Sequence, residues 1–452
     1  MKFLHLGDLH LGRSLSDFDL IEDQQYMLDQ ILGLLRETKA DAVLIAGDIY
    51  DKSIPSEAAV RLLDHFLVKL ADMQIEAFLI SGNHDSDDRL QFGSSFFETR
   101  GIHICSRFEG ELKSYTFTDE YGPVHIWMLP YVKASRVRHY YPDADIVSYE
   151  DAVRIVLEHA DIDYGARNIL IAHQFVAGRE DPVLAGSEGA SVQSVGLVEK
   201  ISAGIFMDFD YVALGHIHSP QRAGAEYIRY SGSMLKYSLS EAANDKSAVL
   251  VTLGGKGCAA GKAAETAEAA EARGAADACD MAEQQTAVTQ IELLPLHPRR
   301  DLRRLKGPLK ELLDSKNVTD TDDYIYATLT DEDIINDVMG IFRQYYPNTV
   351  RIDYDNAHTR EAVLEASGKE AESRTFAELI SDFYRQIYGC EISEEELGVM
   401  QEAAAAAGVA GAGGDMDTSM AGASGRGSED RDVSGGSSNH TGLVKEEGRQ
   451  DS

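Results

Sequence analysis

Aspartate, asparagine and histidine residues follow short apolar runs at five places along the chain. In the first, MKFLHLGDLH, Asp8 and His10 stand two residues apart after the apolar run 3–6. Side chains two residues apart in extended backbone point to the same side, so this spacing brings the two groups together. The other places end in Asp48, in Asn83, His84 and Asp85, in His173, and in His216 and His218. A single place of this kind would mean little, but five require a shared explanation.

These residue types are suited to bind a pair of metal ions. Carboxylate, amide oxygen and imidazole together suit first-row metals such as manganese, iron or zinc. The seven candidate ligands are Asp8, His10, Asp48, Asn83, His173, His216 and His218. That number exceeds what one tetrahedral ion needs and suits two ions that share a carboxylate. Any one histidine alone is more often a core or surface residue, but the whole ordered set predicts a dinuclear metal site.

The apolar runs before these residues predict the sheets that position them. Continuous Val, Ile, Leu and Ala runs are typical of strands that are covered on both faces. Helical periodicity over Asp17–Thr38 and, after Pro55, over Ser56–Met73 gives residues 1–84 a β-α-β-α-β order. In layered α/β domains the ligand crevice lies beyond the carboxyl ends of the strands. The five places are therefore expected to meet at such an edge.

Later segments predict further elements of the same layered domain. Strand and turn are expected over Tyr115–Pro130, with the single tryptophan, Trp127, in the core. A helix is expected over Asp143–Ala160, before the strand that ends at His173. Ser247–Leu253 and Val288–Leu296 are predicted to pair as a hairpin. Residues 254–285, between them, have 12 alanines in 32 residues and no Leu, Ile or Val, so this segment has too little apolar surface to offset its ordering entropy.

Composition limits the classes of function. The formal net charge of −34 argues against a nucleic-acid-binding surface over the whole molecule. It leaves room for a local basic patch, or for a site where metal ions supply the positive charge. The four cysteines show no ligand spacing, which favours a reducing cytoplasm. The chain shows neither a long apolar run nor a signal-peptide pattern, so a cytoplasmic protein without a membrane partner is expected.

The order of the motifs resembles the calcineurin-like metallophosphoesterases. Their pattern is D-x-H, G-D, G-N-H-D, a lone histidine after a strand, and G-H-x-H, all present here in that order. GDLHLGR, GDIYD, GNHDSDDRL and ALGHIH are similar to the SbcD family of nuclease subunits within that group. ELLPLHPRRDLRRLKGPLKEL, at residues 292–312, resembles the start of that family's capping domain. The likeness covers about residues 1 to 400 apart from one insertion.

The resemblance implies a fold and a division into domains. The implied fold class is α/β, a layered metallophosphoesterase β-sandwich flanked by helices, with a small α+β capping domain and C-terminal partner-binding helices. In the cap, strands Tyr324–Leu329 and Thr349–Tyr354 are expected to flank a helix over Asp331–Tyr345. The expected divisions are a nuclease domain 1–253 with a returning strand 286–296, a disordered insertion 254–285, a capping domain 297–364, docking helices 374–400 and a disordered tail 401–452.

The resemblance also implies roles for the candidate residues. It assigns Asp8, His10, Asp48 and His218 to one divalent ion, and Asp48, Asn83, His173 and His216 to the other. Manganese is the expected metal. His84 would be the catalytic donor of a hydrogen bond or proton to the phosphate or leaving group. Asp85 would orient the His84 ring or a ligand.

The implied activity is exonuclease and endonuclease cleavage of double-stranded DNA ends and hairpins in repair, replication and recombination. The implied partner is the SbcC ATPase, whose coiled coil would dock on an amphipathic helix over Thr375–Gly389. The alternative is that the apolar stripe of this helix packs on the chain's own cap. ATP would then enter only through SbcC. A homodimer through the nuclease domain is also expected.

Seven arginines are candidates for contacts with DNA. They are Arg13, Arg89, Arg179, Arg299, Arg300, Arg303 and Arg304. The last four belong to a basic cluster between His297 and Asp314, which could contact a DNA backbone. A solvated helix face explains that cluster equally well, and ordinary surface positions explain the first three.

Two other functions remain open. A phosphatase acting on a protein or small-molecule phosphoester would use the same metals. It would typically show GDxxDRG and GNHE, whereas Asp51 is followed here by Lys52, and His84 by Asp85. A scaffold that had lost catalysis would lack ligands, but all seven and His84 are present.

Overall fold

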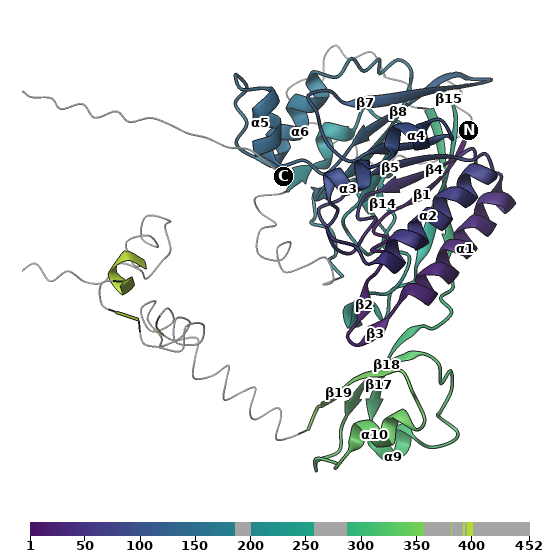
Figure 1. The fold of residues 1–452 in the computed structure, drawn as a ribbon, viewed down its shortest axis with the longest axis vertical. Helices are drawn as coiled ribbons and strands as arrows, with labels where there is room; N and C mark the ends of the chain where they lie inside the picture. The colour runs from purple at the N-terminus through teal and green to yellow at the C-terminus, as the bar shows by residue number, and fades with distance from the viewer. Residues whose placement is uncertain (186–199, 257–286, 357–380, 382–391, 394–395, 401–452) are drawn as a thin grey trace, which may run out of the picture. The chain divides into compact units, whose positions relative to one another are not determined.

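The protein divides into two compact units, Met1–Glu361 and Ala362–Ser452. The computed structural model describes residues 1–185, 200–256, 287–356, 381, 392–393 and 396–400 (Figure 1). Most of the expected insertion, nearly all of the first expected docking helix, and the expected tail therefore lie outside the described residues. None of the described helices is both long enough and apolar enough to cross a membrane.

Two six-stranded sheets form the centre of the first unit. The first has the order β16-β15-β1-β4-β5-β6 and the second the order β13-β14-β12-β9-β8-β7. The strands of the first are β1 (Lys2–Leu6), β4 (Ala42–Ala46), β5 (Glu76–Ile80), β6 (Ile102–Cys105), β15 (Ser247–Lys256) and β16 (Ala287–Pro295). Those of the second are β7 (Lys113–Asp119), β8 (Gly122–Leu129), β9 (Arg167–His173), β12 (Tyr211–Gly215), β13 (Gln221–Ala223) and β14 (Ala225–Tyr230).

The two sheets pack face to face as a sandwich. Phe3 and Phe78 from the first sheet share one buried cluster with Ile171 and Tyr211 from the second. Leu4, the neighbour of Phe3, belongs instead to the cluster that includes the helices on the outer face. Successive side chains of a strand point to opposite faces, and here both faces are covered. This explains why the strands read as continuous apolar runs.

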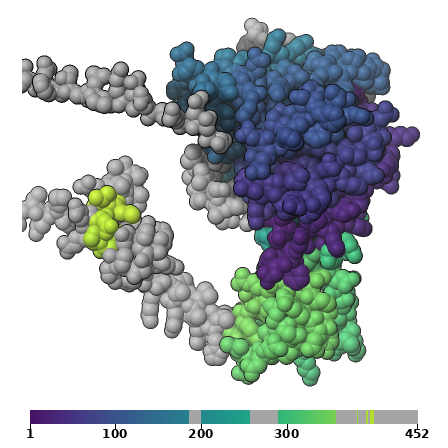
Figure 2. Space-filling view, viewed as in Figure 1, coloured from purple at the N-terminus to yellow at the C-terminus, as the bar shows by residue number. Residues whose placement is uncertain are grey.

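Helices cover the outer faces of the sandwich. α1 (Ile21–Thr38) and α2 (Glu57–Asp72) lie on the first sheet, while α5 (Ala134–Tyr140) and α6 (Tyr149–Glu158) pack in the cluster of the second (Figure 1). The short α3 (Asp87–Gln91) and α4 (Ser94–Glu98) follow β5. In the space-filling view, the purple N-terminal region and the blue region after it meet without a gap (Figure 2). The expected layered α/β class is confirmed.

Two helix starts differ from the sequence-based expectation. The helix expected from Asp17 begins at Ile21, because β2 (Ser14–Leu15) and β3 (Phe18–Asp19) form a small hairpin first. Asp19 Oδ1 then accepts a hydrogen bond from the Ile21 amide at 2.8 Å. The helix expected from Asp143 begins at Tyr149, where Ser148 and Asp151 form a capping box. The expected start of α2 after Ser56 is confirmed, and the Ser56 side chain accepts from the Ala59 amide.

The expected hairpin between β15 and β16 is confirmed. The two strands are antiparallel, with Ser247 opposite Pro295 and Thr252 opposite Gln290. The boundary of the insertion is corrected, because β15 continues to Lys256, inside the range 254–285 expected to be disordered. Residues 257–285 of that range lie outside the described residues.

The region expected to be the capping domain contains a small parallel sheet in the order β17-β18-β19. Its elements are β17 (Leu302–Gly307), α9 (Leu309–Leu312), β18 (Tyr324–Leu329), α10 (Val338–Arg343) and β19 (Thr349–Tyr354). β18 and β19 have the expected bounds. The helix expected over Asp331–Tyr345 is only α10, because Asp337 has a positive φ of 49° and caps the Gly340 amide. The helix considered for the basic cluster is also wrong, since Arg303 and Arg304 lie on β17.

Several short elements complete the described chain. β10 (Val176–Ala177) pairs with β11 (Ile201–Ser202), and two 3-10 turns are η1 (Ala203–Phe206) and η2 (Leu239–Glu241). In the second unit, residues 396–400 are helical. The Glu396 amide donates to Ser393 Oγ and the Ser393 amide to Glu396 Oε2, so a capping box precedes this helix.

Candidate metal centre

The candidate ligands lie beyond the ends of five parallel strands in the two sheets. Asp8 and His10 follow β1, Asp48 follows β4, and Asn83 follows β5. These three strands are parallel neighbours in the first sheet. In the second sheet, His173 ends β9, and His216 and His218 follow its parallel neighbour β12. Because the sheets face each other, their carboxyl ends deliver both groups of side chains to one place.

The backbone is held in an uncommon conformation at four of these residues. Asp8, His10, Asp48 and His216 have positive φ angles of 52°, 44°, 49° and 95°. Non-glycine residues rarely adopt such angles, and those that do concentrate at functional sites. Surrounding bonds fix these turns: the Asp8 amide donates to Gly47 O at 3.1 Å and the His10 amide to Asp48 O at 2.9 Å.

The sheets approach each other closely beneath the site. A Cβ atom added to Gly215 would lie 1.8 Å from the carbonyl oxygen of Ala46 in the opposite sheet. Any side chain at Gly215 would therefore push apart the strand ends that carry Asp48 and His216. The glycine is needed for close approach of the two backbones.

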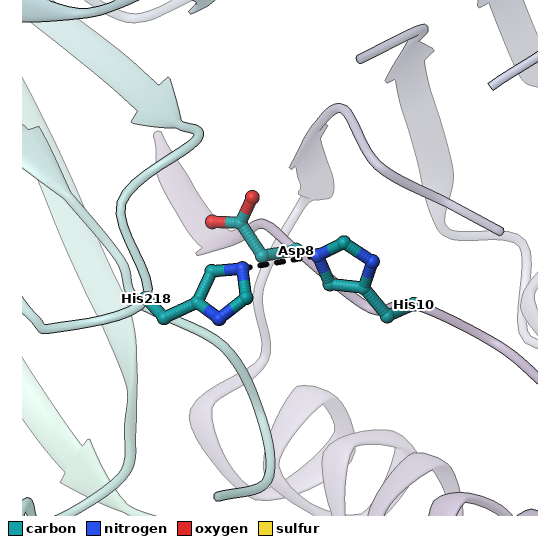
Figure 3. Close-up of side chains that lie close together, drawn as sticks. All are labelled: Asp8, His10 and His218. Atoms are coloured by element: carbon teal, nitrogen blue, oxygen red, sulfur yellow. Dashed lines mark hydrogen bonds between the residues drawn. The ribbon is translucent and has the colours of Figure 1, made fainter. Parts of the chain in front are cut away.

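The first group of ligands contains Asp8, His10 and His218. The Nε2 atoms of His10 and His218 lie 3.0 Å apart, so the two imidazoles face one another (Figure 3). Asp8 lies beside them, and each of the three residues offers one ligand atom within 4.8 Å of the others. His10 Nε2 is also 3.6 Å from Asp48 Oδ2.

The second group contains Asn83, His173 and His216. Asn83 Oδ1 lies 3.1 Å from His173 Nε2 and 3.0 Å from His216 Nδ1. His173 Nε2 is 3.4 Å from Asp48 Oδ2. The same Asp48 oxygen therefore approaches both groups, which is the position expected of a carboxylate that bridges two ions.

The hydrogen bonding of the site fits bound metal. Asp8 Oδ2 is buried and makes no hydrogen bond in the described part of the chain. Buried polar atoms usually have partners, because leaving them unpaired costs about 1–3 kcal/mol. Burial lowers the pKa of His216 to about 3 and lowers that of His10 well below its usual value. Both rings are thus neutral at pH 7, the form in which imidazole ligates metal.

Asp48 and His173 shift each other's pKa in opposite directions. Burial works against ionisation of Asp48, but the neighbouring His173 and His10 outweigh it and hold the pKa of Asp48 well below its usual value. Burial likewise opposes the charge of His173, yet the Asp48 carboxylate raises the pKa of His173 to about 9. Asp48 is therefore an anion at neutral pH, as a bridging ligand must be.

Asp85 supports the loop that carries Asp48. Its carboxylate accepts hydrogen bonds from the amides of Ile49 at 3.0 Å, Tyr50 at 2.9 Å and Gly82 at 2.9 Å. The described hydrogen bonds of Asp85 thus do not reach the His84 ring, contrary to one of the two roles expected for it. His84 Nδ1 instead lies 2.9 Å from the carbonyl oxygen of Asp51, and the His84 amide donates to Asp48 Oδ1 at 2.9 Å.

Sequence reasoning missed a buried group behind His218. Glu241 Oε1 lies 3.7 Å from His218 Nδ1, and the other Glu241 oxygen pairs with Lys246 Nζ. Lys246 Nζ also donates to Ser233 Oγ at 2.8 Å and to the carbonyl of His218 at 2.9 Å. The only signal in the sequence is a glutamate and a lysine between β14 and β15, which is too common a pattern to predict this role.

The predicted DNA-contacting arginines occupy different surroundings. Arg13 Nη1 lies 3.0 Å from Asp51 Oδ1, at the edge of the metal centre. Arg299 and Arg300 pair with Glu22, and Arg300 also with Asp23. Arg303 pairs with Asp323 at 2.6 Å. The remaining arginines, Arg89, Arg179 and Arg304, are exposed.

Comparisons with known protein families agree with this geometry. Residues 1–220 match the model of the calcineurin-like phosphoesterases. Residues 298–388 match a model named SbcD_C and described as the type 5 capsule protein repressor C-terminal domain. Residues 1–220 thus form a calcineurin-like phosphoesterase domain, and residues 298–388 are similar to an SbcD-type C-terminal domain.

Solved structures show only distant likeness. TT1561 of Thermus thermophilus is 11% identical over 55% of this chain and 92% of its own, with a TM-score of 0.33. A dimetal phosphatase from Danio rerio is 13% identical over 56% and 92%, with a TM-score of 0.31. YfcE, a phosphoesterase from E. coli, is 12% identical over 55% and 87%, with a TM-score of 0.24. These scores are too low to carry an argument about function.

Proposed function

We propose that the chain is a DNA phosphodiester hydrolase, the nuclease subunit of an SbcCD-type complex. Its calcineurin-like domain makes it a metal-dependent hydrolase of phosphoesters. The observation that carries the proposal is the position of Asp48 Oδ2, 3.6 Å from His10 Nε2 and 3.4 Å from His173 Nε2, in a chain with an SbcD-type C-terminal domain. The first supports a two-metal centre and the second supports DNA as the substrate.

The two ligand groups define which residues would hold each ion. Asp8, His10, Asp48 and His218 would hold one, and Asp48, Asn83, His173 and His216 the other. When bound, two divalent ions supply positive charge for the phosphate and a water of lowered pKa. Manganese is the metal that we propose. Positive φ angles and burial fix the ligands before substrate arrives, so little reorganisation is needed.

His84 is the proposed donor to the substrate. Its Nδ1 donates to the Asp51 carbonyl at 2.9 Å, so Nε2 donates to the phosphate or the leaving oxygen when the ring carries a proton on both nitrogens. The ring centroid lies 4.9 Å from that of His10, so the side chain stands next to the first ligand group. Loss of His84 would then remove a donor and leave the ligands in place.

The proposal extends to partners and to the setting. SbcC would bind the segment 374–400 and supply ATP hydrolysis, and the complex would act on double-stranded DNA ends and hairpins in cytoplasmic repair, replication and recombination. Phe383, in that segment, lies outside the described residues; Phe383→Glu is expected to abolish co-purification with SbcC. The exposed rings of Phe92 (85%) and Phe96 (67%) beside α3 and α4 support a homodimer through the nuclease domain.

A cleavage assay tests the proposed activity. The purified chain is incubated with manganese and either a labelled DNA hairpin or p-nitrophenyl phosphate, with and without EDTA. Metal-dependent cleavage of the hairpin is expected, and Asp48→Ala serves as the inactive control. Hydrolysis of the monoester without any cleavage of DNA would contradict the proposal and favour the phosphatase alternative.

A further inference from the structure

A cleft of about 580 Å³ lies beside the metal centre. It runs between the loop after β5, which carries Asn83, and helix α5 with the segment that precedes it. The backbone ties the two walls together, because the Tyr131 amide donates to Ser81 O at 3.0 Å. Asn83 belongs both to this cleft and to the second ligand group, so the cleft opens directly onto the place where a phosphodiester would be cleaved.

The floor of the cleft is aromatic. Phe108 is 2% exposed, and Tyr131 is half-buried. The Tyr131 ring also makes an edge contact with the His173 ring, with centroids 6.3 Å apart. A base lying on Tyr131 would therefore sit next to a ligand of the second ion. Stacking on such a ring stabilises an unpaired base by about 1–3 kcal/mol and tolerates any base, since every base has a π-face.

The rim of the cleft is basic, in contrast to the acidic molecule as a whole. Lys133, Arg136 and His139 line it from α5 and the residue before it, and all three are exposed. The two acidic residues in the lining are already engaged. Asp85 accepts three backbone amides, and Asp87 lies 3.4 Å from Arg136 Nη2. Arg136 is therefore shared with Asp87, whereas Lys133 makes no ion pair among the described residues and is the cation that an incoming phosphate would meet.

The size of the cleft selects among nucleic-acid forms. Its volume falls within the range of about 300–1,000 Å³ that is usual for small-ligand sites. One or two nucleotides fit such a space, whereas a duplex does not, because its bases are already stacked inside. An aromatic floor with a cationic rim is the usual arrangement for binding a single strand without sequence preference.

From these observations we propose a subsite for an unpaired DNA strand. Lys133 and Arg136 bind the phosphates next to the scissile one, and Tyr131 stacks with the adjoining base. The subsite rests on the proposed nuclease function and adds to it a substrate form: the strand enters unpaired, as it is in a hairpin loop or a melted end. None of these residues belongs to the seven ligands or to the predicted DNA-contacting arginines.

The test measures binding separately from cleavage. A fluorescein-labelled single-stranded oligonucleotide is titrated with the full chain in EDTA, and its anisotropy is followed at several salt concentrations. For Lys133→Ala/Arg136→Ala, the dissociation constant is expected to rise roughly tenfold at about 0.1 M salt. The slope of log affinity against log salt is expected to become shallower by about 1.4, from about 0.7 for each lost phosphate contact. Lys133→Arg/Arg136→Lys keeps both positive charges, so its salt slope should equal that of the wild type.

A matched control removes the same charge elsewhere. Arg61→Ala/Arg154→Ala takes two paired arginines from the exposed faces of α2 and α6, outside the cleft. Its salt slope should equal that of the wild type; equal slopes for both double variants would overturn the subsite. A wild type that binds through the rim but leaves hairpin DNA intact would overturn the nuclease function and keep the subsite. A wild type without affinity for the oligonucleotide would overturn the subsite, even if hairpin DNA were cleaved.

Discussion

The metal centre contains buried carboxylates, and so does the Asp23 junction, where Asp23 of α1 meets Arg300 and Tyr324. The two places differ in which groups bind the carboxylate oxygens. Asp23 is 1% exposed, and protein donors occupy both of its oxygens. Arg300 donates to Oδ1 at 2.9 Å and to Oδ2 at 2.6 Å, and the Tyr324 hydroxyl donates to Oδ2 at 2.9 Å. At the metal centre, Asp8 Oδ2 has no hydrogen bond among the described residues, and two imidazole nitrogens face each other 3.0 Å apart.

The difference separates structure from function. A buried carboxylate with a complete set of donors needs nothing more, and its role is to join the cap to α1. A buried carboxylate oxygen that accepts no hydrogen bond costs free energy unless a cation completes it. Without metal, the centre therefore lowers the stability of the fold, and the binding of metal removes that cost. The Asp23 junction stabilises the fold without a metal.

The largest effect is expected for Asp48→Ala. This change removes the one carboxylate that approaches both ligand groups, at 3.6 Å from His10 and 3.4 Å from His173. Loss of metal charge stabilisation worth several kcal/mol lowers the rate by on the order of 10³-fold or more. Elemental analysis of the purified variant should find both ions lost or greatly depleted. Retention of two ions per chain would show that Asp48 does not bridge them.

His84→Ala should separate activity from metal binding. The side chain is a proposed donor and not a ligand, so its removal is expected to lower kcat by about 10²–10⁴-fold. The metal content should stay at two ions per chain, measured in the same way. If the variant loses metal, the ring contributes to the ligand set and the assignment is wrong.

Asp23→Ala should act on stability and not on metal. The change leaves the half-buried Arg300 guanidinium and the Tyr324 hydroxyl without their shared partner, at an expected cost of about 2–3 kcal/mol. Chemical denaturation measures this cost. Glu22→Ala is the control, because Glu22 pairs with the same arginine but is exposed, and its loss should cost under about 1 kcal/mol. Equal costs for both variants would show that the buried Asp23 carboxylate stabilises the fold no more than an exposed one.

Asp119 and Arg167 form a second ion pair whose carboxylate is held by protein groups, and its contribution to stability depends on pH. The Arg167 guanidinium, with help from the chain N-terminus, holds the pKa of Asp119 below its usual value. A lowered folded-state pKa stabilises the protein above the unfolded-state pKa of about 3.9, and this stability is lost as the pH falls below it. Asp119→Asn should therefore flatten the acid limb of a stability profile by up to about 1.4 kcal/mol per pH unit. An unchanged acid limb would show that the pair is not linked to folding.

The sequence was sufficient to predict which side chains the structure brings together, because each of them follows an apolar strand. The apolar runs indicated covered strands, whose carboxyl ends meet at one edge. That edge brings Asp8, Asp48 and His173 together although they are far apart in the chain. The bounds of β18 and β19 could be read for the same reason, from apolar runs that end at polar residues.

The remaining parts depend on contacts that no local pattern reveals. The hairpin β2–β3 shortens α1, and a positive φ at Asp337 shortens α10. The hydrogen bonds of Asp85 to three amides and the approach of Glu241 to His218 come from loops that meet only in the folded chain. Propensity and spacing carry no information about such meetings.

The central claim is that two ions share Asp48, and a crystal structure with manganese tests it most directly. An anomalous difference map at the manganese edge should show two peaks, about 3.5–4 Å apart, on either side of the Asp48 carboxylate. His10, Asp51 and His84 form another group whose ligand atoms lie within 4.8 Å of one another. A single peak, or a peak at that group in place of the Asn83, His173 and His216 site, would contradict the claim.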